Sequence, residues 1–232
     1  MLELALSRAA ETVFPAVCYL CGGRLEGIHA ADGVCEPCRL VLPRLREPCC
    51  DRCGVELVSE RLRCMRCRAS ELAFDRNVAL HPYEGAVREL IHLYKIAGHR
   101  RIAGVFAPGL AAIWDRFYRG IAVIPVPGRR VVWSRRGWEH VDEIARRLER
   151  SWGVGVVRCL RRESREAQKT LASPGRLENI RGTITVRPGT VPPSAVLLDD
   201  VLTTGATLSE CARVLREAGC PRVAAMTIGV DE

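Results

Sequence analysis

The chain has 232 residues, 48% of them hydrophobic and 27% charged, which is enough to bury the core of one large domain or two modest ones. This composition excludes general disorder, and no apolar run approaches the roughly 20 residues that cross a bilayer, so we expect no membrane span. The formal charge of +8 is uneven: residues 1–75 hold 10 Arg against 11 acidic residues, whereas residues 76–232 hold 25 basic and 16 acidic residues. The basic surface therefore belongs to the second part, which argues against a uniformly cationic protein that coats DNA.

Composition divides the chain into three parts. Residues 1–15 carry apolar side chains at helical spacing, which predicts a short lead helix. Residues 16–72 hold nine of the twelve cysteines and are interpreted as a small N-terminal double zinc ribbon. In residues 75–232, segments rich in Val, Ile and Leu alternate with amphipathic stretches, so we expect a separate α/β domain.

In the α/β part, predicted strands and helices alternate with short connectors, a pattern typical of a parallel sheet flanked by helices. Ligands of such sheets bind at the carboxyl ends of the strands. The expected helices cover 85–97, 100–118, 139–152 and 207–218, and a short one opens at Ser173 and Pro174. The expected strands cover 121–126, 155–159, 183–186, 195–199 and 222–228.

Eight cysteines form four C-x-x-C pairs, and two such pairs can complete one closed tetrahedral site with each sulfur about 2.3 Å from the metal. Four pairs therefore predict two zinc sites, and a site closed by four thiolates is structural rather than catalytic. Sequential pairing would give tandem zinc ribbons and interleaved pairing a cross-braced module; we favour the sequential arrangement. The expected ligands are Cys18, Cys21, Cys35, Cys38, Cys50, Cys53, Cys64 and Cys67.

Other interpretations of the cysteines stay open. Disulfides or scattered thiols fit the regular spacing less well in a chain that we expect in a reducing cytoplasm, and iron can occupy the same four thiolates. Cys49 could replace Cys50 as a ligand, although the two-residue spacing favours Cys50. Cys159, Cys211 and Cys220 fall on expected strands or helices and are interpreted as small core residues.

Segment 196–208 carries the clearest indication of function. Apolar residues run into Asp199 and Asp200, and a hydroxyl-rich loop then leads into a helix that starts with a capping-box pattern, Thr207-x-x-Glu210. Backbone N–H groups at a helix start, with threonine hydroxyls, favour a phosphate dianion, whereas paired carboxylates suit ribose hydroxyls, directly or near Mg²⁺. We therefore predict a pocket for a ribose 5-phosphate group, with an ordinary capped helix as the alternative. Its expected phosphate-binding residues are Thr203, Thr204, Gly205, Ala206 and Thr207.

The same segment resembles the signature of type I phosphoribosyltransferases, in which two adjacent aspartates and a Thr-Thr-Gly-x-Thr loop hold 5-phosphoribosyl 1-pyrophosphate (PRPP). Over nearly its whole length, the chain resembles the ComF family, whose members join a double zinc ribbon to a phosphoribosyltransferase-like domain. The resemblance implies a type I phosphoribosyltransferase-like parallel sheet and a cytoplasmic link to natural competence, in which members act on incoming single-stranded DNA. The resemblance to the ComF family is also based on Pro125-Val126-Pro127, Arg136-Gly137, Gln168, Arg176, Asn179 and Tyr94-Lys95.

Residues 129–165 are strongly basic, with eleven Arg against five acidic residues and three of the four tryptophans. Arg129 and Arg136 follow a predicted strand end and are expected to clamp the pyrophosphate of PRPP as catalytic residues. A platform on which DNA bases stack and a solvated surface are the alternatives. Lys95, one of only two lysines, is expected to reach an anionic ligand as a compact point charge.

One loop departs from the family pattern. Trp138, Glu139 and His140 stand where the family usually has Phe-Asn-Gln, so the role of that loop in this chain is open. His92 and His99 lie near the same predicted elements, but no histidine spacing forms a metal site, and we assign none of these histidines to catalysis.

Two functions follow from the sequence. The first is an enzyme that binds Mg²⁺ with PRPP, holds the ribose hydroxyls near Asp199 and Asp200, and transfers the phosphoribosyl group to an unidentified acceptor. The second is a non-catalytic competence factor that binds single-stranded DNA and retains a relic PRPP pocket. The expected partners are PRPP or another ribose 5-phosphate compound, single-stranded DNA, and proteins of the competence machinery.

Overall fold

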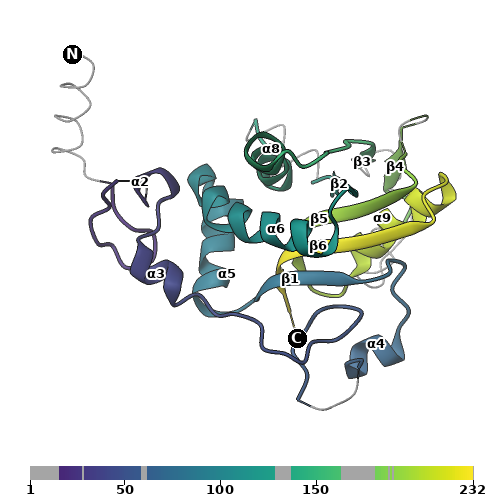
Figure 1. Cartoon of the computed structure of the whole chain (residues 1–232), viewed down its shortest axis with the longest axis horizontal. Helices are drawn as coiled ribbons and strands as arrows, with labels where there is room; N and C mark the ends of the chain where they lie inside the picture. The colour runs from purple at the N-terminus through teal and green to yellow at the C-terminus, as the bar shows by residue number, and fades with distance from the viewer. Residues whose placement is uncertain are drawn as a thin grey trace, which may run out of the picture.

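The protein is described by a computed structural model that covers residues 16–27, 29–58, 62–128, 137–162, 181–187, 189 and 191–231. Four parallel strands form its central sheet, and helices pack against that sheet (Figure 1). Within these residues no helix is both long enough and apolar enough to cross a membrane. The parallel sheet, its helices and the cysteine-rich N-terminal region confirm the predicted fold class.

The sheet has the strand order β1-β6-β5-β2, and every neighbouring pair is parallel. The chain also extends the edge beside β2, because Val156 forms a parallel bridge with Val123. The central strands are largely buried, as expected for a parallel sheet covered on both faces. The strands are β1 (Asn77–Pro82), β2 (Ala122–Pro125), β5 (Ser194–Leu202) and β6 (Arg222–Val230).

The helices of the α/β part contribute to two hydrophobic cores. The helices and helical turns are α5 (Gly85–His92), which continues into the π-helical turn η1 (Leu93–Ala97), the 3₁₀ turn η2 (Arg100–Ile102), α6 (Ala103–Phe117), α8 (His140–Trp152) and α9 (Ala206–Glu217). One core contains α5, α6 and α8, and the other contains α9. Side chains alternate along β5, so Val196 and Leu198 join the core of α5, α6 and α8, whereas Ala195 and Leu197 join the core of α9. The α9 core also contains the fully buried Cys159, Cys211 and Cys220, as predicted.

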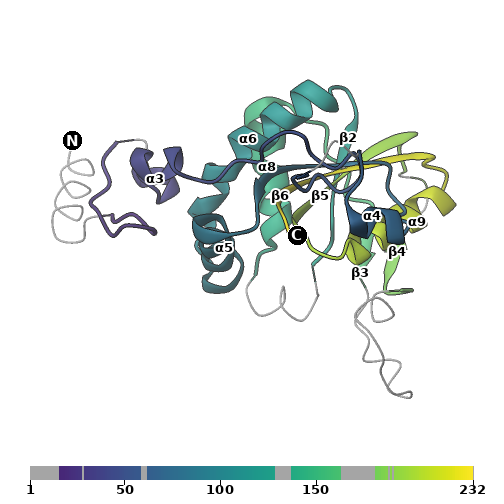
Figure 2. The same ribbon diagram turned by 90° about the horizontal axis from the view of Figure 1, so that it is seen from below.

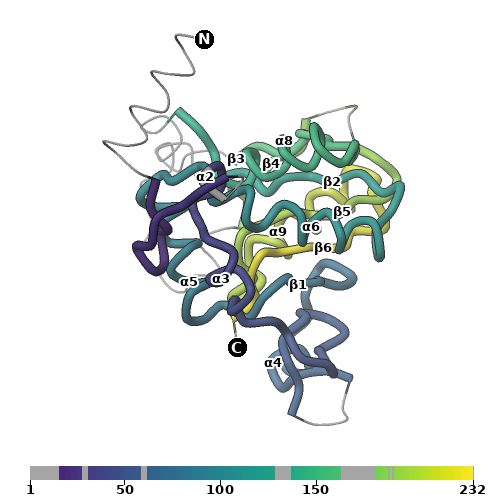
Figure 3. The backbone as a smooth tube through the Cα atoms, turned by 60° about the vertical axis from the view of Figure 1, so that its left-hand side comes forward, coloured from purple at the N-terminus to yellow at the C-terminus, as the bar shows by residue number. Residues whose placement is uncertain are grey.

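The two cysteine modules contact different cores. The first ribbon, from Cys18 to Cys38, contains α2 (His29–Asp32) and most of α3 (Glu36–Leu40), and packs with the core of α5 and α6. The second ribbon, from Cys50 to Cys67, includes most of α4 (Met65–Ala69) and packs with the core of α9. Figure 3 shows the first ribbon beside α5 and the second ribbon below β1.

Most elements expected in the α/β part are confirmed, with two corrections. The strand expected at 155–159 is wrong in extent, because only Val156 bridges β2, and the next strand, β3 (Leu160–Arg162), pairs antiparallel with β4 (Ile184–Val186). The sequence pattern gives no indication of β1, because its buried Asn77 and His81 interrupt the apolar pattern. The lead helix expected within 1–15 and the short helix at 173–174 lie outside the described residues.

Candidate functional site

The eight expected ligands gather in two groups, each built from two consecutive C-x-x-C pairs. Within each group, the four Sγ atoms lie within 4.8 Å of one another. The Cys21–Cys35 and Cys53–Cys64 Sγ–Sγ distances are both 3.7 Å, and sulfurs around tetrahedral zinc with bonds of about 2.3 Å lie about 3.8 Å apart. The donor sets therefore fit two structural zinc ions in the sequential arrangement. The groups are Cys18, Cys21, Cys35 and Cys38, and Cys50, Cys53, Cys64 and Cys67.

Backbone N–H groups favour the thiolate form of two ligands. Cys35 N donates to Cys18 Sγ, and Cys64 N donates to Cys50 Sγ, both at 3.4 Å. Burial opposes ionisation of Cys50, but backbone donors outweigh burial and lower the pKa of the Cys50 thiol to about 7. Cys49 lies outside the group and donates its thiol hydrogen to a backbone oxygen, so the group contains Cys50 rather than Cys49.

We expect Cys53→Ser to destabilise the protein more than Cys21→Ser. Cys53 is 0% exposed in the α9 core, whereas Cys21 is exposed. Loss of the buried ligand removes metal-binding free energy and leaves a hydroxyl in that core, so Cys53→Ser should lower the melting temperature by about 10 °C, the shift of a roughly 3 kcal/mol loss. Cys21→Ser should shift it less than half as far. Thermal denaturation with zinc analysis checks this, and equal shifts would contradict it.

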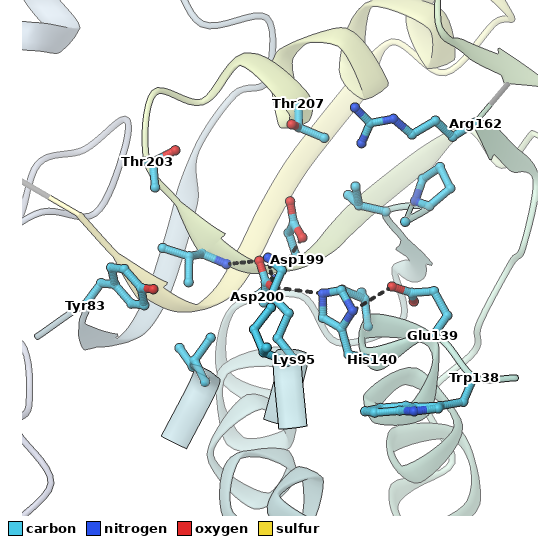
Figure 4. A pocket seen from close by; sticks show the side chains of 17 residues that line it. Tyr83, Lys95, Trp138, Glu139, His140, Arg162, Asp199, Asp200, Thr203 and Thr207 are labelled. Atoms are coloured by element: carbon cyan, nitrogen blue, oxygen red, sulfur yellow. Dashed lines mark hydrogen bonds and ion pairs between the residues drawn. The ribbon is translucent and has the colours of Figure 1, made fainter. Parts of the chain in front are cut away.

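A cavity of about 430 Å³ lies at the carboxyl end of β5. The loop after β5 and the start of α9 border one side, and η1 with the segment before α8 borders the other (Figure 4). Ligands of parallel sheets bind at this end of the strands. Polar side chains reach it from Tyr83, Lys95, Glu139, His140, Arg162, Asp199, Asp200, Thr203 and Thr207.

Asp200 is held by two cationic side chains. Lys95 Nζ donates to Asp200 Oδ2 at 2.6 Å, and His140 Nε2 lies 2.8 Å from the same oxygen. Val201 N donates to Asp200 Oδ1 at 2.7 Å, so both carboxylate oxygens are engaged. Burial alone would raise the pKa of Asp200, but the hydrogen bond from His140 and the charge of Lys95 outweigh it and hold that pKa well below its usual range. Asp200 therefore carries a fixed negative charge in the cavity wall.

His140 lies between two carboxyl groups. Its Nε2 faces Asp200, and its Nδ1 lies 3.0 Å from Glu139 Oε1. The Glu139 contact is electrostatic rather than an aligned hydrogen bond, because Glu139 Oε1 has no well-aligned donor among the described residues. Burial opposes the charged imidazole, but the hydrogen bond to Asp200 outweighs it and raises the pKa of His140. The position between two carboxyl groups and the raised pKa both favour the imidazolium form of His140.

The π-helical turn η1 positions the residues around His140. It places Lys95 in the cavity wall and buries Tyr94 completely. The Tyr94 hydroxyl donates to the His140 backbone oxygen, and the Tyr94 ring lies 5.3 Å from the Trp138 ring, centroid to centroid. The Arg100 guanidinium lies 5.0 Å from the Trp138 ring centroid, so this tryptophan is already packed against two side chains. Such π-helical turns often occur at functional sites.

Asp199 differs from its neighbour in orientation and in charge. Its side chain points toward Thr207 and Arg162, away from Lys95 (Figure 4). Burial and the charge of Asp200 raise the pKa of Asp199 to about 7. A carboxyl group that is partly protonated near neutral pH donates as well as accepts hydrogen bonds, which suits the hydroxyl groups of a sugar. Two adjacent carboxyl groups with separated pKa values take different roles.

The loop after β5 turns sharply at Gly205, immediately before α9. Gly205 has a φ of +76°, a conformation that favours glycine. It is the N-cap residue of α9 and has no side chain to cap the helix. Among the described residues, the one side-chain hydrogen bond given for the Ala206 N–H is a long one, to Thr204 Oγ1 at 3.4 Å. Thr203 and Thr207 line the cavity beside this turn. The start of α9 is therefore open to an anion.

The predicted capping box at Thr207 and Glu210 is wrong. Helix α9 begins at Ala206, and Glu210 is used elsewhere. Glu210 accepts from Gly182 N at 2.7 Å and pairs with Arg213 at 2.8 Å. The Glu210 carboxylate is thus engaged by a cation of its own helix and by an N–H group of another segment, and it does not reach back to the helix start.

Lys95 reaches the cavity, where it contacts Asp200. Arg129 and Arg136 lie outside the described residues, although Gly128 lines the cavity. The structure also brings side chains to the cavity to which the sequence assigns no role. For Glu139 and His140, the departure of residues 138–140 from the family pattern was the available sequence signal. Of the predicted residues, the structure places Lys95, Asp199, Asp200, Thr203 and Thr207 around the cavity and Thr204, Gly205 and Ala206 in the adjoining turn; the unassigned polar residues are Tyr83, Glu139, His140 and Arg162.

The carboxyl groups alone offer little to a magnesium ion. Mg²⁺ takes oxygen ligands at about 2.1 Å and is commonly held by one or two carboxylates together with substrate phosphates. Both oxygens of Asp200 are engaged, and two cations adjoin it. Asp199 is the remaining carboxyl group of the pair, so these residues fit magnesium only where a diphosphate supplies further oxygens.

Comparisons with known sequences cover both parts of the chain. A family model described as a double zinc ribbon domain matches residues 9–68. DNA utilization protein YhgH of Salmonella typhi is 27% identical over 90% of this chain and 94% of its own length. Competence protein F of Haemophilus influenzae is 27% identical over 89% of this chain and 93% of its own length. Competence protein ComFC of Bacillus subtilis is 23% identical, with 92% and 94% covered.

Two solved structures are similar at lower coverage. The allosteric regulatory enzyme of purine biosynthesis is 19% identical, with a TM-score of 0.34, and the match covers 51% of this chain and 24% of that chain. Adenine phosphoribosyltransferase from Rhodothermus marinus is 17% identical, with a TM-score of 0.30, and the match covers 59% of this chain and 83% of that chain.

Proposed function

Because this chain belongs to the ComF family, we propose that its cavity binds the 5-phosphoribosyl group of PRPP or of another ribose 5-phosphate compound. The observation that carries the proposal is that Asp199, Thr203 and Thr207 line both the cavity and a smaller adjoining hollow. That hollow is also lined by Thr204, Gly205 and Ala206, at the start of α9. The helix start offers N–H groups to a phosphate, and Asp199 offers both a donor and an acceptor to sugar hydroxyls.

The size and the polar residues of the cavity support a small phosphorylated ligand. Its volume of about 430 Å³ falls in the range of small-molecule sites. Thr203 and Thr207 add hydroxyl donors to the α9 amides, and Arg162 lines the same side of the cavity. In this proposal Asp200 fixes the cavity wall through Lys95 and does not bind the ribose itself.

We further propose transfer of the phosphoribosyl group to an acceptor. The bond from the anomeric carbon to pyrophosphate breaks, positive charge develops at that carbon, and the acceptor forms the new bond. Positioning and electrostatics supply the rate, so no protein nucleophile is needed. Arg129 and Arg136 are proposed to hold the departing pyrophosphate through charge-assisted hydrogen bonds. Magnesium carried by the diphosphate would neutralise further charge.

The names of the relatives support a second candidate function. They are called DNA utilization and competence proteins, and residues 76–232 hold 25 basic against 16 acidic residues. Under this alternative the chain binds single-stranded DNA without catalysis, and the ribose pocket is a sensor or a relic. In either case we place the protein in the cytoplasm, where its thiols stay reduced, with competence proteins as partners.

A ligand screen by thermal shift tests the proposal. The ligands are PRPP, ribose 5-phosphate, AMP and short single-stranded oligonucleotides, each with and without Mg²⁺. We expect ribose 5-phosphate to raise the melting temperature without metal, and Mg²⁺ to increase the shift by PRPP. Stabilisation by oligonucleotides alone would contradict the pocket assignment. Release of pyrophosphate from PRPP with an acceptor present would establish transfer.

A further inference from the structure

The turn at Gly205 packs against the segment that leaves the second ribbon. A Cβ atom added to Gly205 would lie 2.8 Å from Leu72 Cδ2 and 3.7 Å from Phe74 Cε1. Leu72 is 9% exposed and Phe74 is 0% exposed, so these side chains have little freedom to move away. The turn that precedes α9 therefore rests on a closely packed apolar support.

A hydrogen bond extends this support to α9. Ala73 N donates to Ser209 Oγ at 3.2 Å. Ser209 N in turn donates to Gly205 O at 2.8 Å, which is the first main-chain bond of the helix. The segment at Ala73 is thus anchored to the turn of α9 that would contact a phosphate.

Arg52 connects the same segment to the second ribbon. It lies inside the third C-x-x-C pair, and its Nη2 donates to Leu72 O at 2.6 Å while its Nη1 donates to Asp75 O at 2.9 Å. Its own backbone oxygen accepts from Asn77 N at 2.8 Å, at the start of β1. One side chain of a zinc-binding turn therefore fixes both ends of residues 72–75.

The first ribbon offers a matched contrast. Arg39, next to its second C-x-x-C pair, also makes two side-chain hydrogen bonds, from Nε to Val34 O at 3.1 Å and from Nη2 to Asp32 Oδ2 at 2.6 Å. Both bonds stay inside the first ribbon, which packs with the core of α5 and α6. Figure 2 shows α3 and α4 at separate places on the molecule.

We propose that the second ribbon is a positioning element of the ligand site, in which Arg52 and Ser209 hold the Gly205 turn so that α9 presents its N–H groups to a phosphate. Zinc on the second ribbon would keep the turn that carries Arg52 in place. The effect on ligand affinity rests on the proposed function, whereas the effect on the turn itself does not.

Arg52→Gln and Arg39→Gln test this inference as a matched pair. Hydrogen–deuterium exchange in residues 203–209, measured without ligand, should be about tenfold faster in Arg52→Gln, as expected when hydrogen bonds from a charged group are lost. The affinity for ribose 5-phosphate should fall about fivefold or more. Arg39→Gln should change neither quantity, and both variants should retain two zinc ions per chain.

Ser209 gives an independent variant of the same contact. Ser209→Ala should speed exchange in residues 203–209, and Ser209→Thr, which keeps the hydroxyl, should restore slow exchange. Unchanged exchange in both Arg52→Gln and Ser209→Ala would overturn the inference, as would equal acceleration in Arg39→Gln. If wild-type protein binds no ribose phosphate, the proposed function fails, while the exchange comparison still decides whether the second ribbon holds the turn.

Discussion

Replacing Asp200 with asparagine should lower the free energy of unfolding by about 3 kcal/mol near pH 6, because it removes the anion shared by two cations in a buried site. Asp200 is 4% exposed, and Lys95 Nζ and His140 Nε2 lie 2.6 and 2.8 Å from its Oδ2. Asparagine keeps the shape and the acceptor for Val201 N but not the charge. We place the loss at the lower end for buried pairs because the Lys95 side chain is 45% exposed. Urea denaturation at fixed zinc concentration measures it.

The difference between wild type and Asp200→Asn should depend on pH. The pKa of His140 is raised in the folded state, so its contribution is complete below the usual histidine pKa of about 6.5 and is lost as pH rises through the folded value. The pKa of Asp200 is lowered, so its contribution is present above the usual aspartate pKa of about 3.9 and is lost only on acidification through the folded value. The difference should therefore be larger at pH 6 than at pH 9.5.

An exposed ion pair provides the control. Asp115 and Arg119 pair at 3.3 Å on the surface, with side chains 61% and 79% exposed. Asp115→Asn should change the free energy of unfolding by no more than about 0.5 kcal/mol at either pH. If Asp200→Asn behaved like this control, the buried charges would contribute little to stability, and the cavity wall would have to be held by packing alone.

Local spacing explains which parts of the site could be predicted. The cysteines of each proposed zinc group come from short-range C-x-x-C pairs, and Asp199 is followed within eight residues by the whole loop that is proposed to bind phosphate. These features follow from adjacent residues and from the rule that parallel strands bind ligands at their carboxyl ends. A pattern read along the chain therefore predicts them.

Contacts between distant segments explain what could not be predicted. His140 lies 60 residues before Asp200 in the chain, and the fold brings them together because α8 packs beside β5. Its raised pKa depends on that partner, so its residue type alone gives no sign of it. In β1, burial of the polar Asn77 is tolerated because its side-chain amide donates to Cys53 O and Thr227 Oγ1. Those two partners lie in other segments, so the local sequence does not reveal that Asn77 is a buried strand residue.

The same reasoning applies to the second ribbon and to the helix start. The change in composition near residue 75 suggests separate parts, yet Cys53 and Phe74 share one core with α9. The capping-box pattern at Thr207 is satisfied in the sequence, but Glu210 finds partners in Gly182 and Arg213. The capping-box pattern therefore does not form a cap, because a tertiary contact with Gly182 engages Glu210 instead, and the start of α9 stays open.

Ala206→Glu should abolish ribose 5-phosphate binding without destabilising the protein. Ala206 is the first residue of α9, is partly exposed, and lies in the turn proposed for phosphate. A carboxylate in the first turn interacts favourably with the helix dipole and should stabilise the fold by about 0.3–1 kcal/mol. The same charge occupies the place of the phosphate and repels it; two like charges about 4 Å apart near a protein surface cost about 4 kcal/mol, so affinity should fall at least about 100-fold.

Ala206→Gln separates charge from size in this experiment. Glutamine has nearly the same volume as glutamate, so it should reduce affinity only by about fivefold if the repulsion of phosphate is electrostatic. Isothermal titration with ribose 5-phosphate and thermal denaturation of both variants provide the two readouts. Equal loss of binding in both variants would indicate a steric effect, and unchanged binding in Ala206→Glu would mean that the phosphate does not bind at the start of α9. If the open start of α9 binds phosphate, Ala206→Glu should raise stability and lower affinity for ribose 5-phosphate. The two effects have opposite signs because the same N–H groups interact with either the carboxylate or the phosphate.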